Sequence, residues 1–302
     1  MNIVHPALSI AMKVAARLGA AVLVGAVVLP LPLDAESPPK VIPCASAPDK
    51  MACIEGGPFI RGADDGPPHA RPKATVWLQT FYMDKYEVTY GEYMACIKAG
   101  KCRRAGPNYP DFDNPKQPIN GINWYDADNF CKVHGKHLPT EAEWEKAARG
   151  TDGRKFPWGN EPASCKYLVF ENEKGRSCGV PQAGKHPEKG RPEPVGTKPP
   201  NQYGLYDMAG NAYEWVADWY SKSYEKCGDA CSGINPKGPC DGREKCPSTL
   251  KRRVVRGGSW YWGEERATTY YRRSHTPENN PFHHFGFRCA ASVEEANKLL
   301  GK

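Results

Sequence analysis

The sequence predicts a single α+β domain with little regular secondary structure, held together by disulfides. Short helical patterns are concentrated in the first half of the chain, and short strand-like runs and irregular segments follow them. The 302 residues include 30 glycines and 29 prolines, a content typical of loop-rich folds yet below that of disordered chains. Twelve cysteines and an aromatic content of 11% indicate disulfides and a buried core.

The N-terminus has the pattern of a secretory signal. Basic residues precede the apolar run 18–33, and the small residue Ala35 follows it. This run is shorter than the ~20 apolar residues that a membrane anchor requires, and two prolines break its end. We therefore expect a signal peptide over 1–35 and a Pro-rich linker over 36–43. The mature protein is expected to be exported, periplasmic or secreted, with no membrane span after cleavage.

All twelve cysteines follow that segment, and an even number in an exported chain predicts disulfides. Short spacings predict three local pairs, which are Cys44 with Cys53, Cys96 with Cys102, and Cys165 with Cys178. A second group is expected to pair internally in an order that the sequence leaves open: Cys227, Cys231, Cys240 and Cys246. Zinc binding is the alternative for that group. Cys131 and Cys289 remain as a long-range pair.

Three helices are predicted ahead of the irregular region. Thr89 and Glu92 form a capping-box pattern for the first helix, and a glycine ends it. The second helix is predicted over 124–135. Thr140 and Glu143 repeat the capping-box pattern for the third helix, which also stops at a glycine.

Strands are predicted from short apolar or alternating runs. They fall within residues 56–65, 76–89, 214–220, 251–260 and 284–292. The chain is then expected to end in a C-terminal tail over 294–302. The net charge is +7, and the densest basic run, 250–256, is interpreted as a solvated strand edge. We expect no nucleic-acid partner, because an exported protein meets little nucleic acid.

Oxygen donors gather in the segment 204–220. Asp207, Asn211 and Glu214 lie within eight residues, and Gly210 allows a sharp backbone turn between them. Hard cations such as calcium bind carboxylate and main-chain carbonyl oxygens. The alternative is a turn whose acidic side chains cap neighbouring backbone amides.

Five segments in order carry a family resemblance: HLPTEAEWEKAARG, FPWGN, NQYGLYDMAGNAYEW, RGGSW and FGFRCA. Together they resemble the sulfatase-modifying-factor family, which includes the formylglycine-generating enzymes. The resemblance spans Cys53 to Ser292, so we assign the domain to 44–293. It implies a fold related to C-type lectins, with little regular secondary structure and bound calcium.

The resemblance places one calcium ion on the oxygen-rich segment. Asp207 and Glu214 would supply side chains, and Gly210 and Ala212 would supply main-chain carbonyls. A second calcium site of the family needs an asparagine where Tyr167 stands here, so it is not expected. The family also has a disulfide that matches Cys131 and Cys289.

The resemblance also predicts what the catalytic centre lacks. In the formylglycine-generating enzyme, two cysteines after GGS bind copper(I), and a cysteine of the substrate is oxidised. Soft thiolates suit copper(I), but Trp262 and residues near 265–267 occupy those positions here. Ser259, which matches a serine beside that centre, is retained. Copper is therefore not expected.

Iron is not expected either, because the histidines are scattered along the chain. His134 and His137 flank the turn before the third helix, while His283 and His284 are adjacent. On a strand, adjacent side chains point to opposite faces, so we expect no facial triad of iron ligands.

The remaining site candidates lie in the segment Arg256–Arg273, except Tyr213. The pocket candidates are Ser259, Trp262, Glu265 and Arg266, and the predicted ligand groove consists of Tyr213, Trp260 and Trp262. Trp262 is the better candidate for ligand contact, while Trp260 is expected to be structural. Glu264 and Glu265 are candidates for acid–base catalysis, and a salt-bridged loop is the alternative.

These observations predict an exported, monomeric binding or accessory protein with structural calcium. Its ligand would be a peptide, a glycan or a small molecule. The alternative is a metal-dependent oxidoreductase of the same family, active in periplasmic protein or peptide maturation. Oxidation of a sulfatase cysteine to formylglycine ranks third.

Overall fold

The computed structural model describes residues 39–106, 109–182, 189–243, 246, 250–278 and 283–302. The chain divides into two units, 1–37 and 38–302, and the described residues belong to the second. The predicted signal peptide and residues 36–38 of the predicted linker therefore lie outside the described residues. No helix in the described part is long and apolar enough to span a membrane.

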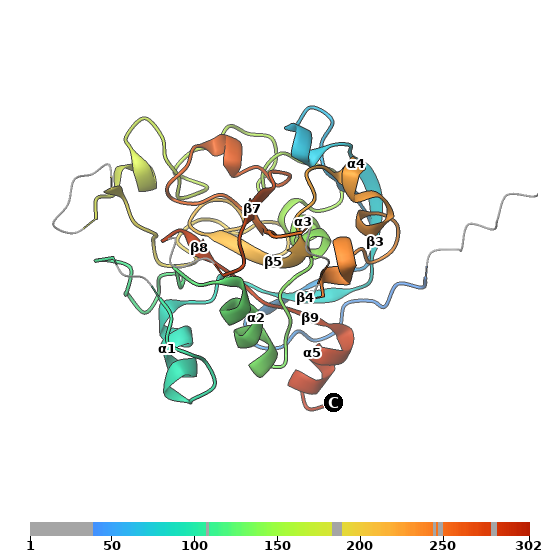
Figure 1. The fold of residues 1–302 in the computed structure, drawn as a ribbon, viewed down its shortest axis with the longest axis horizontal. Helices are drawn as coiled ribbons and strands as arrows, with labels where there is room; N and C mark the ends of the chain where they lie inside the picture. The colour runs from blue at the N-terminus through green and yellow to red at the C-terminus, as the bar shows by residue number, and fades with distance from the viewer. Residues whose placement is uncertain (1–38, 107–108, 183–188, 244–245, 247–249, 279–282) are drawn as a thin grey trace, which may run out of the picture. The chain divides into compact units, whose positions relative to one another are not determined.

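The strands form three small sheets (Figure 1). Their bounds are β1 Met51–Ile54, β2 Gly57–Arg61, β3 Ala74–Leu78, β4 Phe81–Asp84, β5 Tyr213–Trp219, β6 Arg253–Arg256, β7 Arg273–His275, β8 Phe285–Gly286 and β9 Ala290–Ser292. The strand orders are β1-β4-β9, β2-β3 and β7-β6-β5-β8. Every pairing within these sheets is antiparallel except β5 with β8, which is parallel. These short strands and few helices confirm the predicted fold class.

The helices are short and begin at capping residues. Their bounds are α1 Tyr90–Lys98, α2 Trp124–Val133, α3 Glu141–Arg149, α4 Tyr224–Cys227 and α5 Val293–Leu299. The predicted capping boxes at Thr89 and Thr140 are both present, with Glu92 and Glu143 as their reciprocal partners. In each, the threonine side chain and the glutamate three residues later satisfy each other's backbone amides, which fixes where the helix starts.

The C-terminal prediction was wrong in two respects. The single strand predicted over 284–292 is two short strands, β8 and β9, in different sheets. The predicted tail over 294–302 contains helix α5, which begins with a capping box of Ser292 and Glu295. Its buried Ala296 packs in a small apolar cluster with residues of β1, β4 and β9. This apolar contact stabilises a helix that would be marginal in isolation.

Two apolar clusters make up most of the core. One lies between α1, α2 and the β5–β6–β8 strands, and the Cys131–Cys289 disulfide is part of it. The other surrounds α3, whose buried Trp144 packs among residues of β2, β3, β4, β5 and β6. In Figure 1, α1, α2 and α5 lie on one side of the sheets, and irregular loops cover the other side.

The basic run 250–256 was interpreted as a solvated strand edge, which is wrong for its strand part, 253–256, whereas Lys251 and Arg252 are exposed. Arg253 and Arg256 are fully buried on β6. The guanidinium of Arg253 lies 3.8 Å from the ring centre of Trp124 and 3.7 Å from that of Trp219. Arg256 forms ion pairs with glutamates of α3. The aromatic and acidic partners of these arginines are remote in sequence. The sequence of the run alone therefore indicated solvent exposure.

The disulfide prediction is confirmed for every pair that the sequence specified. The predicted pairs are present as Cys44–Cys53, Cys96–Cys102, Cys131–Cys289 and Cys165–Cys178. The open group pairs as Cys227–Cys231 and Cys240–Cys246. All twelve cysteines are thereby used. Because the four cysteines of the open group are paired, they do not provide the thiolates that zinc binding would need.

Candidate functional site

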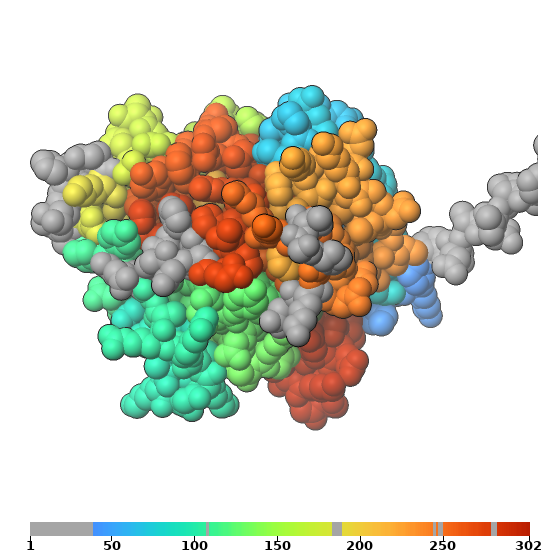
Figure 2. All heavy atoms as spheres, in the orientation of Figure 1, coloured from blue at the N-terminus to red at the C-terminus, as the bar shows by residue number. Residues whose placement is uncertain are grey.

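The segment that follows β6 turns sharply at two glycines. Gly257 and Gly258 have φ values of 92° and 76°, a conformation that favours glycine. A Cβ on Gly258 would lie 2.9 Å from the Cα of Ala267 and from the carbonyl oxygen of Arg266. The turn therefore folds the segment back against itself before it enters β7. In Figure 2 this orange-to-red segment reaches the surface on the face shown.

Three of the predicted site residues lie beneath that surface. Ser259 is buried, and its hydroxyl accepts a 3.4 Å hydrogen bond from the amide of Tyr261. Trp260 is 1% exposed and packs edge-on against Phe112. Tyr213 is 0% exposed because it lies on β5, between β6 and β8. Burial therefore contradicts a groove position for Tyr213 and Trp260, and it agrees with the expectation that Trp260 is structural.

Tyr261 and Trp262 are half-buried, and arginines cover their rings. The guanidinium of Arg176 lies 3.5 Å from the ring centre of Tyr261. Those of Arg266 and Arg273 lie 3.8 and 5.4 Å from the ring centre of Trp262. Such contacts are cation–π interactions. Sequence reasoning named Arg266 but not Arg176 or Arg273, which come from a separate loop and from β7.

Glu264 and Glu265 lie beside Trp262 in a salt-bridged loop, which was the alternative to acid–base catalysis. Glu264 and Glu265 begin a short 3-10 helix that ends at Arg266. Glu265 is 65% exposed and lies 3.3 Å from Nε of Arg266. An exposed carboxylate beside its neighbouring arginine lacks the environment that tunes a catalytic acid or base.

His283 and His284 lie together in this region, which the sequence prediction did not anticipate. They precede β8, so strand alternation does not separate them, and their ring centres are 5.0 Å apart. Both rings contact Tyr261, at 5.7 and 5.5 Å. Burial, followed by the nearby His283 and Arg273, lowers the pKa of His284 to about 2. His284 is therefore a neutral imidazole in the folded protein.

The other two histidines have different partners. His134 contacts the carbonyl oxygen of Phe130 at the end of α2. His137 lies between two carboxylates, 2.7 Å from Glu295 and 3.4 Å from Glu143. In the part of the chain that the structure describes, no group of three or more His, Cys, Asp or Glu side chains is arranged to hold a metal ion.

The oxygen-rich segment is buried and tightly constrained. Asp207 and Asn211 have positive φ values of 55° and 54°, which cost energy outside glycine. One oxygen of Asp207 accepts a 2.7 Å hydrogen bond from the amide of Gly196. A Cβ on Gly210 would lie 2.4 Å from the carbonyl oxygen of Val169, so only glycine fits.

Both carboxylate oxygens of Glu214 accept hydrogen bonds. Arg288 donates to each oxygen at 2.8 Å, and the indole N–H of Trp144 donates to one of them, also at 2.8 Å. The carboxylate and the guanidinium are both completely buried.

Glu87 is a third buried carboxylate here, and sequence reasoning missed it. It accepts a 2.9 Å hydrogen bond from the amide of Ala212 and a 2.7 Å bond from the side chain of Asn211. Burial, and then the charges of Asp207 and Glu214, raise its pKa well above the usual range. Burial likewise raises the pKa of Asp207, to about 6. No local pattern marks Glu87, because its partners are more than 100 residues away.

Tyr167 is the residue that the resemblance matches to the asparagine of a second calcium site. Its ring stacks on that of Trp158, with ring centres 4.9 Å apart.

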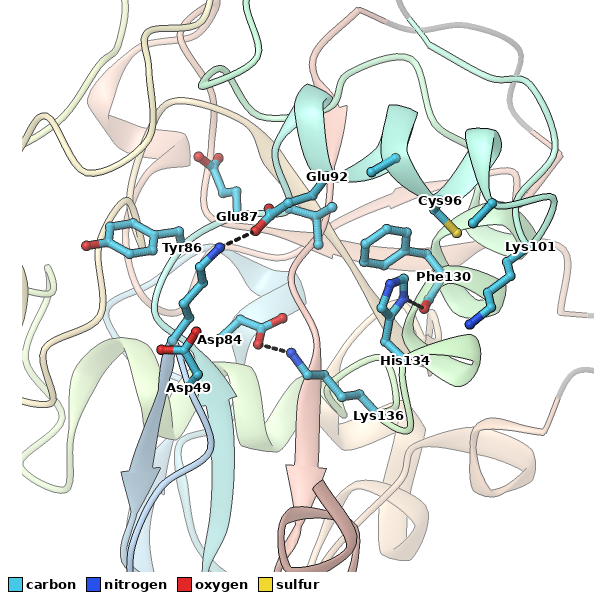
Figure 3. A pocket seen from close by; sticks show the side chains of 14 residues that line it. Asp49, Asp84, Tyr86, Glu87, Glu92, Cys96, Lys101, Phe130, His134 and Lys136 are labelled. Atoms are coloured by element: carbon cyan, nitrogen blue, oxygen red, sulfur yellow. Dashed lines mark hydrogen bonds and ion pairs between the residues drawn. The ribbon is translucent and has the colours of Figure 1, made fainter. Parts of the chain in front are cut away.

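Two cavities lie away from the segment that follows β6. One, of about 330 Å³, lies beside α1 and α2, and Figure 3 shows its Lys50–Glu92 and Lys136–Asp84 ion pairs. Glu87 lines it. The other, of about 570 Å³, includes His137 in its wall. None of the four predicted pocket candidates lines either cavity.

A family model described as "Sulfatase-modifying factor enzyme 1-like domain" matches residues 39–293. The chain belongs to this family. The formylglycine-generating enzyme of Bos taurus is 31% identical to it over 302 residues, which covers 82% of this chain and 75% of that protein. The mouse protein named "Inactive C-alpha-formylglycine-generating enzyme 2" is also 31% identical, with coverages of 80% and 86%.

Other proteins similar to this chain differ in length and name. The chain is 32% identical to the serine/threonine-protein kinase pkn1 of Chlamydia caviae over 267 residues, which covers 81% of this chain but only 38% of that protein. The solved structure of PvdO from Pseudomonas aeruginosa has a TM-score of 0.62 and 26% identity. That match covers 80% of this chain and 94% of PvdO.

Proposed function

We propose that this sulfatase-modifying-factor protein binds a ligand and does not carry out copper-dependent cysteine oxidation. The observation that carries the proposal is the pairing of all twelve cysteines in disulfides. Copper(I) needs soft thiolate ligands, and Trp262 stands where the resemblance places one of them. The mouse relative whose name calls it inactive supports the idea that the fold serves roles other than oxidation.

The ligand-binding face is the half-buried pair Tyr261 and Trp262 with the arginines around it. Aromatic rings and guanidinium groups together provide large contact areas and strong hydrogen-bond donors, a combination enriched at binding hot spots. A peptide, a glycan or a small molecule could use both. Because Tyr213 and Trp260 are buried, contact falls to Tyr261 and Trp262.

We also propose that a calcium ion stabilises the segment beneath this face. The side chain of Asp207 and the carbonyls of Gly210 and Ala212 would hold it, together with the lone pair of Glu214 that its three hydrogen bonds leave free. The charge balance fits a cation: Glu87, Asp207 and Glu214 are buried together, and among the described residues the guanidinium of Arg288 forms an ion pair with Glu214 alone of the three. One oxygen of Asp207 has no hydrogen bond from a described residue. The ion would supply stability, and no catalytic step is assigned to it.

The six disulfides favour an oxidising compartment, so we propose that the protein is exported to the periplasm or secreted. It would act there as a monomer. A metal-dependent oxidoreductase is the second candidate function. The observation that favours it is the closeness of His283 and His284 to Tyr261, since imidazoles are common metal ligands.

The test is a binding screen with Trp262→Ala and a matched control, Trp158→Ala. Trp158 is also half-buried but lies outside the proposed face. Arrays of peptides, glycans and small molecules would be probed with the oxidised, exported protein. We expect at least one ligand whose affinity falls about tenfold or more in Trp262→Ala alone. Ligands whose binding is indifferent to Trp262 would contradict the proposal.

A further inference from the structure

Two arginines share one aromatic ring on the proposed face. Arg266, at the end of the short 3-10 helix, and Arg273, at the start of β7, both lie over Trp262. Arg273 also lies 5.1 Å from the ring centre of Tyr213. Two guanidinium groups therefore meet at the same indole, although they repel each other.

Their charges are poorly neutralised by the protein itself. Within the described ranges, Arg273 forms no ion pair with a carboxylate, and Arg266 pairs only with its exposed neighbour Glu265. Buried arginines elsewhere in this chain behave differently. Arg256 and Arg272 contact Glu141 at 2.8 and 2.7 Å, and Arg288 is fully paired with Glu214.

Apart from the carboxylate of Glu265, the groups named around the two arginines carry no negative charge. The indole N–H of Trp262 is buried without a hydrogen-bond partner among the residues that the structure describes. Burial and the neighbouring cations lower the pKa values of His275 and His284, so the imidazoles there are neutral. The carboxylate beside these groups, Glu265, points to solvent with 65% of its side chain exposed.

We propose that Arg266 and Arg273 bind an oxyanion group, a carboxylate or a phosphate, of the ligand that contacts Trp262. This inference rests on the proposed binding function and specifies its ligand class as a small organic anion. A guanidinium presents a planar fork of N–H donors that matches both anions bidentately. An anion placed between the two arginines would also remove their mutual repulsion.

The experiment uses three fluorinated aromatic probes with the full-length oxidised protein. Para-fluorobenzoate and para-fluorophenyl phosphate carry the two anions, and para-fluorobenzylamine carries a cation on the same ring. Binding is followed by fluorine NMR for the wild type, Arg273→Gln, Arg266→Gln and a matched control, Arg252→Gln. Arg252 is exposed just before β6 and is not one of the two arginines over Trp262, so its replacement removes the same charge without removing a member of the proposed pair.

We expect at least one anionic probe to bind while the amine does not. Arg273→Gln and Arg266→Gln should each weaken that binding about tenfold, whereas Arg252→Gln should leave it within about twofold. The preferred anion distinguishes a carboxylate ligand from a phosphate ligand. Arg273→Lys keeps the charge but loses the fork, so it should bind with intermediate affinity. Melting temperatures of all variants check that they are folded.

Three results would overturn the inference. They are equal binding of the amine, binding by Arg273→Gln that matches the wild type, and no binding of either anion. A neutral ligand that depends on Trp262 in the array screen would leave the proposed function standing while this inference fails. Loss of binding in both Trp262→Ala and Trp158→Ala would instead count against the proposed function.

Discussion

Nε and Nη2 of Arg288 each donate a 2.8 Å hydrogen bond to Glu214, one to each carboxylate oxygen. This pair joins β5 to the segment between β8 and β9, deep in the protein. The indole of Trp144 adds a third donor from α3. Three elements that are distant in sequence thus meet at one carboxylate.

Replacing Arg288 by methionine should destabilise the fold strongly. Glu214, Glu87 and Asp207 would then share a buried site without their paired guanidinium, and such an uncompensated charge costs about 3–5 kcal/mol. Urea denaturation at neutral pH measures this loss. Arg154→Met, which breaks the exposed pair with Asp152, serves as the control and should cost less than about 1 kcal/mol. Equal losses of unfolding free energy in the two variants would contradict the role given to the buried Arg288–Glu214 pair.

His137 should make stability depend on pH in the alkaline range. Burial alone would lower its pKa, but Glu143 and Glu295 more than reverse this effect and raise it to about 10. The unfolded value is about 6.5, so the folded state binds the proton more tightly. The stabilisation is therefore complete below pH ~6.5 and is lost as the pH rises through about 10.

His137→Gln tests this dependence. The variant should be about 1–3 kcal/mol less stable than the wild type at neutral pH, and the difference should shrink towards pH ~11. Guanidinium denaturation at both pH values gives the difference directly. His134→Gln is the control, because His134 contacts a carbonyl instead of carboxylates. A difference that is independent of pH would show that His137 acts only by packing.

The long-range disulfide should contribute more stability than a local one. Cys131 and Cys289 are separated by 158 residues, whereas Cys227 and Cys231 are separated by 4. Closing a long loop removes more entropy from the unfolded chain, so the Cys131→Ala/Cys289→Ala variant should lose about 2–5 kcal/mol. Non-reducing thermal melts would compare it with Cys227→Ala/Cys231→Ala, which should lose clearly less. A larger loss in the short-loop variant would contradict this account.

Calcium removal should lower the melting temperature. A ligand present at about a hundred times its Kd stabilises the native state by about 2.7 kcal/mol, and a chelator would remove that contribution. Asp207→Asn should melt lower than the wild type and should not respond to the chelator. Asp229→Asn changes an exposed aspartate and should respond as the wild type does. A wild-type melting temperature indifferent to the chelator would contradict the calcium proposal.

Local signals in the sequence predicted the local structure well. Thr89 and Thr140 begin their helices as expected, because a capping box depends on residues only three positions apart. The short disulfides followed from spacing for the same reason. Helix α5 was missed although Ser292 and Glu295 repeat that pattern, because its weakly apolar sequence gave no reason to look for a packed face.

Long-range relationships could not be predicted in this way. The burial of Arg253 depends on Trp124 and Trp219, which approach it only in the folded chain. Glu87 meets Asn211 for the same reason. The candidate face was therefore predicted in part: Trp262 and Arg266 were identified from one segment, whereas Arg273 was not.

We propose that this member of the family does not perform copper-dependent cysteine oxidation. The most direct measurement combines a copper(I) titration of the oxidised protein with mass spectrometry of a peptide that carries a sulfatase cysteine motif. The account predicts no stoichiometric copper binding and an unchanged cysteine in the presence of oxygen. One copper ion per chain, together with conversion of that cysteine to formylglycine, would contradict it.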